Sequence, residues 1–243
     1  MFRVAPLSWL ALVFGYWMAM TVISFIPLVG VVAASVLVPA FSVGFMAASR
    51  AAENRRPPGL TNLGAGFRNH AGAQIALGAV YFAAIAALLA ATTLADDGTL
   101  ARWMSTGERP SPEKLASDEF VHALLVAAAL YVPVMMAFWF APVLVAWQGL
   151  SAAKALFFSF FGCLINWRAF LAYGVGAAVA LFLLPAGVAL AALLLSAGQA
   201  RSVLVGVMFP FMLMLLPTLF ASFYASYRDV FGEREERGVE GST

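Results

Sequence analysis

The chain has 243 residues, of which 63% are hydrophobic and 11% are charged, and its formal net charge is +2. Soluble domains are about 45–50% apolar and about 25% charged, so this composition excludes a soluble globular protein and a disordered one. The only cysteine, Cys163, excludes an internal disulfide, and the small net charge gives no reason to expect a nucleic acid partner. The sequence predicts an integral membrane protein.

Six mostly apolar stretches are long enough to cross a bilayer as helices, which requires about 20 residues. They run over residues 9–28, 30–49, 71–94, 121–147, 170–195 and 202–227. No segment shows the two-residue alternation of a membrane β-barrel. We therefore predict an all-α polytopic bundle of six transmembrane helices. Residues 1–228 form a single transmembrane domain, and residues 229–243 form a polar cytoplasmic tail.

The first span resembles a secretory signal because Arg3 precedes its apolar run. The run is longer than the hydrophobic region of a signal peptide, and Pro27 interrupts it, so we expect it to be retained. Residues 27–30, Pro-Leu-Val-Gly, leave so short a connection to the second span that these two helices form a tight hairpin.

Each even-numbered span contains a proline that a cation follows 11 or 12 residues later. The prolines are Pro39, Pro142 and Pro217, and the cations are Arg50, Lys154 and Arg228. Eleven helical residues cover about 16 Å, so each proline is expected near mid-membrane, where it kinks its helix. The pattern predicts three hairpins related by an internal repeat. The repeat is either purely architectural or, as in transporters with broken helices, the frame of a midplane substrate site.

The distribution of cations predicts the orientation. Ten of the Lys and Arg residues lie on the face that carries both chain ends, and four lie on the other face. Because cytoplasmic loops are enriched in cations, the N- and C-termini are expected in the cytoplasm. The connection between spans three and four fits the outer face, since it is rich in Asp and Glu.

Two cytoplasmic connectors have helical periodicity. Residues 60–70 predict a short helix on the membrane surface, and residues 151–166 place polar side chains such as Ser159 on one arc and phenylalanines on the other, half sunk in the leaflet. Candidate lipid or partner contacts are the cations and aromatic residues near these connectors: Arg55, Arg56, Arg68, Lys154, Phe157, Phe160, Trp167 and Arg168. Cations are enriched on the cytoplasmic side of membrane proteins and tryptophan at membrane interfaces. This alone explains the positions of these residues, without a binding partner.

No pattern in the sequence predicts catalysis, a metal or a cofactor. Zinc-protease, phosphate-loop and serine-hydrolase motifs are absent, and His70 and His122 belong to opposite faces. Cys163 is expected to pack as a small apolar residue. Four pairs of small residues spaced by four predict close helix contacts: Gly44 with Ala48, Gly72 with Ala76, Gly174 with Ala178, and Gly176 with Ala180.

Three short segments carry a resemblance to known proteins. They are Trp139-Phe140-Ala141-Pro142, residues 155–160 (Ala-Leu-Phe-Phe-Ser-Phe) and residues 166–170 (Asn-Trp-Arg-Ala-Phe). With them the chain resembles an uncharacterised family of proteobacterial inner-membrane proteins and, more distantly, YciC-like six-helix membrane proteins. The resemblance implies a place in the bacterial inner membrane and no assigned activity.

Two functions from different classes follow from these observations. The first is a non-enzymatic inner-membrane protein that acts through contacts with lipids or with another membrane protein, including a second copy of itself. The alternative is a small transporter or channel for a neutral or apolar solute, which requires a continuous polar or water-accessible cavity at the depth of Pro39, Pro142 and Pro217.

Overall fold

The computed structural model describes residues 5–26, 30–68, 70–195 and 200–232, and these residues form helices joined by turns, without strands. The α-helices are α1 (Pro6–Ser24), α2 (Gly30–Glu53), α3 (Ala65–Arg68), α4 (Ala71–Asp96), α5 (Thr99–Thr106), α6 (Pro112–Leu115), α7 (Asp118–Trp139), α8 (Ala141–Gln148), α9 (Ala152–Ile165), α10 (Trp167–Ala178), α11 (Leu184–Leu195) and α12 (Ala200–Tyr227). The segment η2 (Leu60–Gly64) is a 3-10 helix, and η3 (Val179–Leu183) and η4 (Arg228–Gly232) are π-helical. The all-α prediction is confirmed.

Five helical stretches among the described residues are long and apolar enough to cross a membrane. They are Pro6–Ser24, Val32–Glu53, Ala71–Asp96, Asp118–Gln148 and Trp167–Ala191. Helix α12 occupies the sixth predicted range. The predicted turn at residues 27–29 and the predicted tail from residue 233 lie outside the described residues.

The three prolines of the predicted repeat have different effects on their helices. Pro39 and Pro217 lie inside α2 and α12, which continue through them. At Pro142 the fourth predicted span is broken, because α7 ends at Trp139 and α8 begins at Ala141. A proline ring has no N–H and crowds the carbonyl four residues earlier, which accounts for a break at this point.

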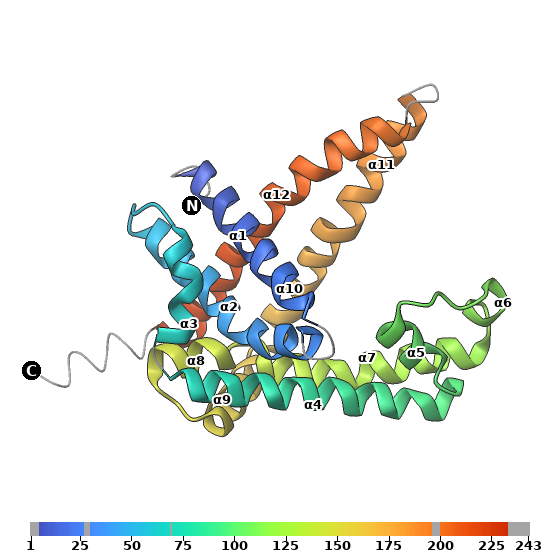
Figure 1. Ribbon diagram of the computed structural model, residues 1–243, viewed down its shortest axis with the longest axis horizontal. Coiled ribbons are helices and arrows are strands. Elements are labelled where there is room, and N and C mark those ends of the chain that lie inside the picture. The colour runs from blue at the N-terminus through green and yellow to red at the C-terminus, as the bar shows by residue number, and fades with distance from the viewer. Residues whose placement is uncertain (1–4, 27–29, 69, 196–199, 233–243) are drawn as a thin grey trace, which may run out of the picture.

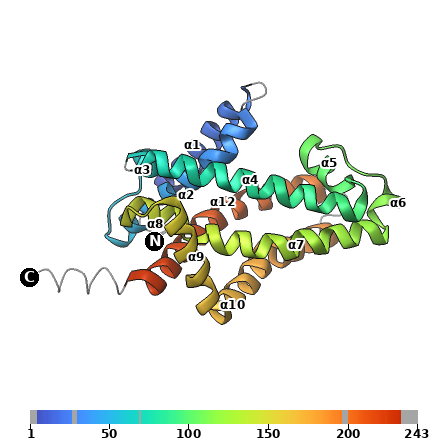
Figure 2. The same cartoon turned by 90° about the horizontal axis from the view of Figure 1, so that it is seen from below.

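The helices form two long antiparallel pairs that meet at one end of the molecule. In Figure 1 the pair of α4 and α7 runs horizontally, and the pair of α11 and α12 rises away from it toward the upper right. The pairs converge where α8, α9 and the C-terminal end of α12 lie together, which we call the packed end. Figure 2 shows α12 passing behind the pair of α4 and α7, with α10 beside α7. The opposite end, where the two pairs diverge, we call the splayed end.

The packed end contains the largest cluster of buried side chains. The largest buried cluster joins α2, α4, α8, α9, α12 and η4 with the residue between α7 and α8, and consists of Val43, Met46, Leu77, Phe140, Ala141, Val143, Leu144, Val145, Ala155, Cys163, Tyr224, Tyr227 and Phe231. Phe231 belongs to the segment predicted as polar tail. It is buried because η4 continues α12 and brings the ring within 5.2 Å of Phe140, centroid to centroid.

Close backbone approaches hold the helices around α2. A Cβ at Gly78 of α4 would collide with the backbone oxygen of Val36, and a Cβ at Gly66 would collide with that of Ala40. At Gly44 it would lie 2.7 Å from Cα of Leu63. Such contacts require glycine, since any side chain would separate the helices.

The first connector packs against α2. Residues 60–68 are helical as expected, but Leu63 and Gly66 are buried. Both η2 and α3 pack against α2. Leu63 is buried against Gly44 of α2. A helical wheel of the connector alone does not reveal this contact.

In the second connector, α9, the buried and the exposed side chains lie on different faces of the helix. Ser159 and Cys163 point into the packed end and are buried, whereas Phe157, Phe158 and Phe161 are exposed. Of the arc that the sequence identifies as polar, Ser159 is buried against the protein, whereas Ser151 and Lys154 are exposed. The exposed phenylalanines lie toward the surroundings, as expected for a face in contact with lipid.

Candidate functional site

The break between α7 and α8 is held by a side chain from α9. The Ser159 hydroxyl accepts a hydrogen bond from Phe140 N at 2.8 Å and donates one to the Met136 carbonyl oxygen at 2.8 Å. These are the two backbone groups that would bond to each other in a continuous helix, so the hydroxyl is inserted into the helical ladder. Gln74 of α4 donates from Nε2 to the Pro142 carbonyl oxygen at 2.6 Å.

A cavity of about 380 Å³ lies beside this break, and we call it the proline cavity. Helices α2, α4, α7, α8, α10 and α12 and the π-helical segment η3 surround it. Its lining consists of Val38, Pro39, Ser42, Tyr81, Tyr131, Met135, Phe138, Trp139, Pro142, Tyr173, Ala177, Leu181, Leu219, Phe220 and Phe223. Ligand sites of about 300–1,000 Å³ with mostly apolar walls bind small molecules and cofactors.

The walls of the proline cavity are aromatic and uncharged. Trp139 makes edge-to-face contacts with Tyr173 and Phe223, with ring centroids 5.6 and 5.1 Å apart. Its indole nitrogen Nε1 is buried and has no hydrogen-bond partner within the described parts of the chain. The polar atoms of the lining side chains are this nitrogen and the hydroxyls of serine and tyrosine. Such a site suits a hydrocarbon chain or another apolar group better than an ion.

A second apolar cavity of about 690 Å³ lies toward the far ends of α4 and α7. Leu100 and Met104 of α5 line it, so it reaches the connection between spans three and four. Tyr81 and Tyr131 line both this cavity and the proline cavity. The two cavities therefore adjoin across these tyrosine side chains.

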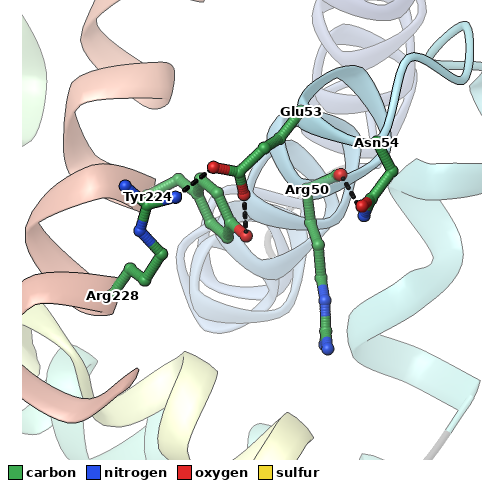
Figure 3. A network of polar contacts seen from close by, with 5 residues as sticks. All are labelled: Arg50, Glu53, Asn54, Tyr224 and Arg228. Carbon is green, nitrogen blue, oxygen red and sulfur yellow. Dashed lines mark hydrogen bonds and ion pairs between the residues drawn. The ribbon is translucent and has the colours of Figure 1, made fainter. Parts of the chain in front are cut away.

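A polar network joins the ends of α2 and α12 (Figure 3). Glu53 accepts a hydrogen bond from the Tyr224 hydroxyl at 2.7 Å and forms an ion pair with Arg228. Arg50 points away from this carboxylate and lies over the ring of Trp147, 5.1 Å from its centroid. Two cations that the sequence placed on equivalent hairpins, Arg50 and Arg228, are thus brought to one place.

Two of the predicted kink residues line the proline cavity, Pro39 and Pro142. Pro217 is buried in α12, and the cavity wall there is formed by Leu219 and Phe220. A cavity does lie at the depth of two of these prolines, as the transport hypothesis requires. Its lining is predominantly apolar, whereas that hypothesis predicted a polar or water-accessible one.

The predicted lipid or partner contacts lie outside the cavity. Phe157 and Trp167 are more than half exposed, at 56% and 57%, and Phe160 is half-buried. The remaining predicted residues, all exposed, are Arg55, Arg56, Arg68, Lys154 and Arg168. Of these cations, Arg68 donates a hydrogen bond to the Thr61 carbonyl oxygen at 2.9 Å, which ties α3 to η2.

Several residues of the candidate site have no counterpart among the sequence predictions. Gln74 and the tyrosines at 81, 131 and 173 lie within predicted spans and line or brace the cavity. Amides at membrane depth and tyrosines away from the interface are signals that could have identified them, because both side chains need hydrogen-bond partners in lipid.

Comparison with known proteins places the chain beside one curated bacterial relative. It is similar to a probable inner membrane protein of Burkholderia thailandensis, with 40% identity over 242 residues that cover 97% of this chain and 88% of the relative. No protein-family model matches the chain, and no solved structure does. The relative's name gives its location, the inner membrane, and gives no activity.

Proposed function

The chain belongs to the family of the probable inner membrane protein of Burkholderia thailandensis, and we propose that it is a non-enzymatic lipid-binding protein of the bacterial inner membrane. Its ligand is the hydrocarbon chain of a membrane lipid held in the proline cavity. The single observation that carries the proposal is the uncharged, aromatic cavity of about 380 Å³ between the long helices. Lipid hydrocarbon is the apolar molecule at highest concentration around such a site.

The proposed topology has six transmembrane helices in three hairpins, with both termini in the cytoplasm. The excess of cations on one face supports it. The contact of Glu53 with Tyr224 and Arg228 adds support, because it keeps the C-terminal ends of α2 and α12 at one level. The packed end then faces the cytoplasm, and the splayed end reaches the outer leaflet.

The lipid-binding experiment compares two neighbouring alanines on α10. Ala177 lines the proline cavity, and Ala178 is exposed. Each is changed to phenylalanine, the protein is purified in mild detergent, and retained phospholipid is counted by mass spectrometry. We expect Ala177→Phe to retain about tenfold less lipid than the wild type, because the added ring fills the cavity. Ala178→Phe should retain as much as the wild type. Equal retention by both variants and the wild type would overturn the proposal.

A transporter for a neutral or apolar solute is the second candidate. It is supported by the meeting of the proline cavity with the larger cavity at Tyr81 and Tyr131, which together extend from the helix break toward the outer connection. Liposome flux of an apolar dye distinguishes it from simple lipid binding. Loss of flux in folded Pro142→Ala favours transport, and a wild type without flux excludes transport of that dye.

Contact with a membrane-protein partner or a second copy is a further part of the proposal. It is supported by helix α10 and segment η3, which have no buried residue. The oligomeric state in lipid nanodiscs tests whether a second copy covers this surface.

A further inference from the structure

A small cavity with several polar residues in its wall lies between the start of α10 and the end of α12. It has a volume of about 320 Å³, and its polar lining residues include Asn166, Ser222, Ser226 and Asp229. In the proposed topology, α10 begins and α12 ends at the cytoplasmic interface, so this cavity lies at the depth of lipid headgroups. We call it the headgroup cavity.

Tyr173 connects the headgroup cavity with the proline cavity, because its side chain lines both. Its hydroxyl lies 2.9 Å from Ser222 Oγ, and the two hydroxyls share a hydrogen bond at the boundary. Polar side chains, including the charged Asp229, form a larger share of the headgroup cavity than of the proline cavity, so the two together become more polar toward one end, as an amphiphile does. A single lipid molecule can occupy both.

The length of the combined site matches one leaflet. From Asn166, which lines the headgroup cavity, to Leu181, which lines the proline cavity, is a rise of about 22 Å at 1.5 Å per residue. Half of a bilayer with its headgroups is about 20–22 Å thick. The headgroup of a lipid would therefore reach the polar residues while its chain extends to the depth of the prolines.

The charge of the lining selects among headgroups. Asp229 is the charged side chain that lines the headgroup cavity, and it has no ion-pair partner within residues 5–232 as described. Its neighbour Arg228 is engaged with Glu53 on α2. A carboxylate, the serine hydroxyls and the Asn166 side-chain oxygen are all acceptors, which suits a group that carries several N–H donors.

We infer, on the basis of the proposed lipid-binding function, that the headgroup cavity binds the primary ammonium of a phospholipid headgroup whose acyl chain occupies the proline cavity. Asp229 is the residue that makes the site prefer a headgroup with an ammonium group. Tyr173 and Ser222 form the boundary between head and chain.

The experiment offers a choice of lipids to the delipidated full chain. The protein is reconstituted in nanodiscs of equal phosphatidylethanolamine and phosphatidylglycerol, extracted gently, and the retained lipids are measured by native mass spectrometry. We compare the wild type, Asp229→Asn and Glu108→Gln, whose glutamate is exposed in the connection at the other end of α4 and α7. Far-ultraviolet circular dichroism shows that each variant is folded.

The wild type and Glu108→Gln are expected to retain the ethanolamine lipid about two- to fivefold over the glycerol lipid, as an exposed ion pair allows. Asp229→Asn should retain the same total lipid without the preference. Equal preference in the wild type and Asp229→Asn, or no preference in the wild type, overturns the inference and leaves chain binding intact. Absence of retained lipid in the wild type overturns the proposed function itself.

Discussion

The packed end and the splayed end have similar compositions and opposite packing. At the packed end, α8 contributes five buried residues out of eight. Helix α10 and segment η3, which lead toward the splayed end, contribute none, and Leu183 and Leu194 are exposed there. Lipid is as apolar as leucine, so hydrophobicity does not drive helices together inside a membrane. Buried hydrogen bonds distinguish the packed end: Ser159 bonds to the backbone at the break, and Gln74 bonds to the Pro142 carbonyl oxygen.

The largest expected contrast is in thiol chemistry within α9. Burial raises the pKa of the Cys163 thiol from 9.0 to about 12, so its thiolate fraction at neutral pH is about a thousandfold lower than that of a free cysteine. We expect maleimide to leave Cys163 unmodified in the folded protein and to label Ile165→Cys in a Cys163→Ala background. Ile165 is exposed two residues further along. Rapid labelling of native Cys163 would contradict a closed packed end.

The next effect concerns glycine. Gly78→Ala is expected to destabilise the protein by about 3 kcal/mol, because its Cβ meets the backbone of α2 and neither helix can yield cheaply. Gly174→Ala is the matched control on α10, where a Cβ meets nothing within 4 Å. Unfolding in detergent measures both variants. Similar stability of the two variants would show that α2 and α4 are less closely packed than described.

Removal of the inserted hydroxyl has a smaller effect. Ser159→Ala leaves Phe140 N–H and the Met136 carbonyl without their bridge, and we expect a loss of about 2 kcal/mol in the free energy of unfolding. Ser24→Ala serves as the control, since that exposed hydroxyl bonds to the carbonyl oxygen of Met20 on its own helix. A loss no greater than that of the control would mean that the backbone at the break closes without Ser159.

The smallest effect is expected at the exposed edge of the packed end. Glu53→Gln keeps an acceptor for Tyr224 and removes the ion pair with Arg228, which costs about 0.5 kcal/mol because the pair is partly solvated. High salt should lower the stability of the wild type toward that of the variant, since salt screens the pair. Thermal unfolding at two salt concentrations measures this. If the stability of the wild type does not depend on salt, the ion pair does not contribute to the packing of α2 against α12.

The helices follow from local sequence and could be predicted, whereas the break could not be assigned to Pro142, because α2 and α12 continue through Pro39 and Pro217. An apolar run of about 20 residues needs internal hydrogen bonds in lipid, and proline interrupts those bonds. Of the four small-residue pairs that predicted close contacts, Gly44 lies against a neighbouring backbone, whereas Gly72, Gly174 and Gly176 have nothing within 4 Å. Spacing along one helix does not say which helix lies opposite it.

The candidate site depends on contacts between residues far apart in the chain. The Glu53 pair spans 175 positions, and the bond between Gln74 and Pro142 spans 68. Ser159 was expected on a polar arc, and it is buried because its hydroxyl bonds to the two backbone groups left unpaired at the break in α7. A helical wheel separates polar from apolar faces. It does not show whether a polar side chain bonds to water or to backbone groups that lack a partner within their own helix.

The Ser159 oxygen has a mechanical consequence. It holds one backbone group on each side of the break, so a change in the angle between α7 and α8 must also displace α9 or break one of these bonds. The exposed phenylalanines of α9 turn with that helix as a rigid body. A change in the angle at the break is therefore coupled to a tilt of the exposed aromatic face of α9 through the two hydrogen bonds of Ser159.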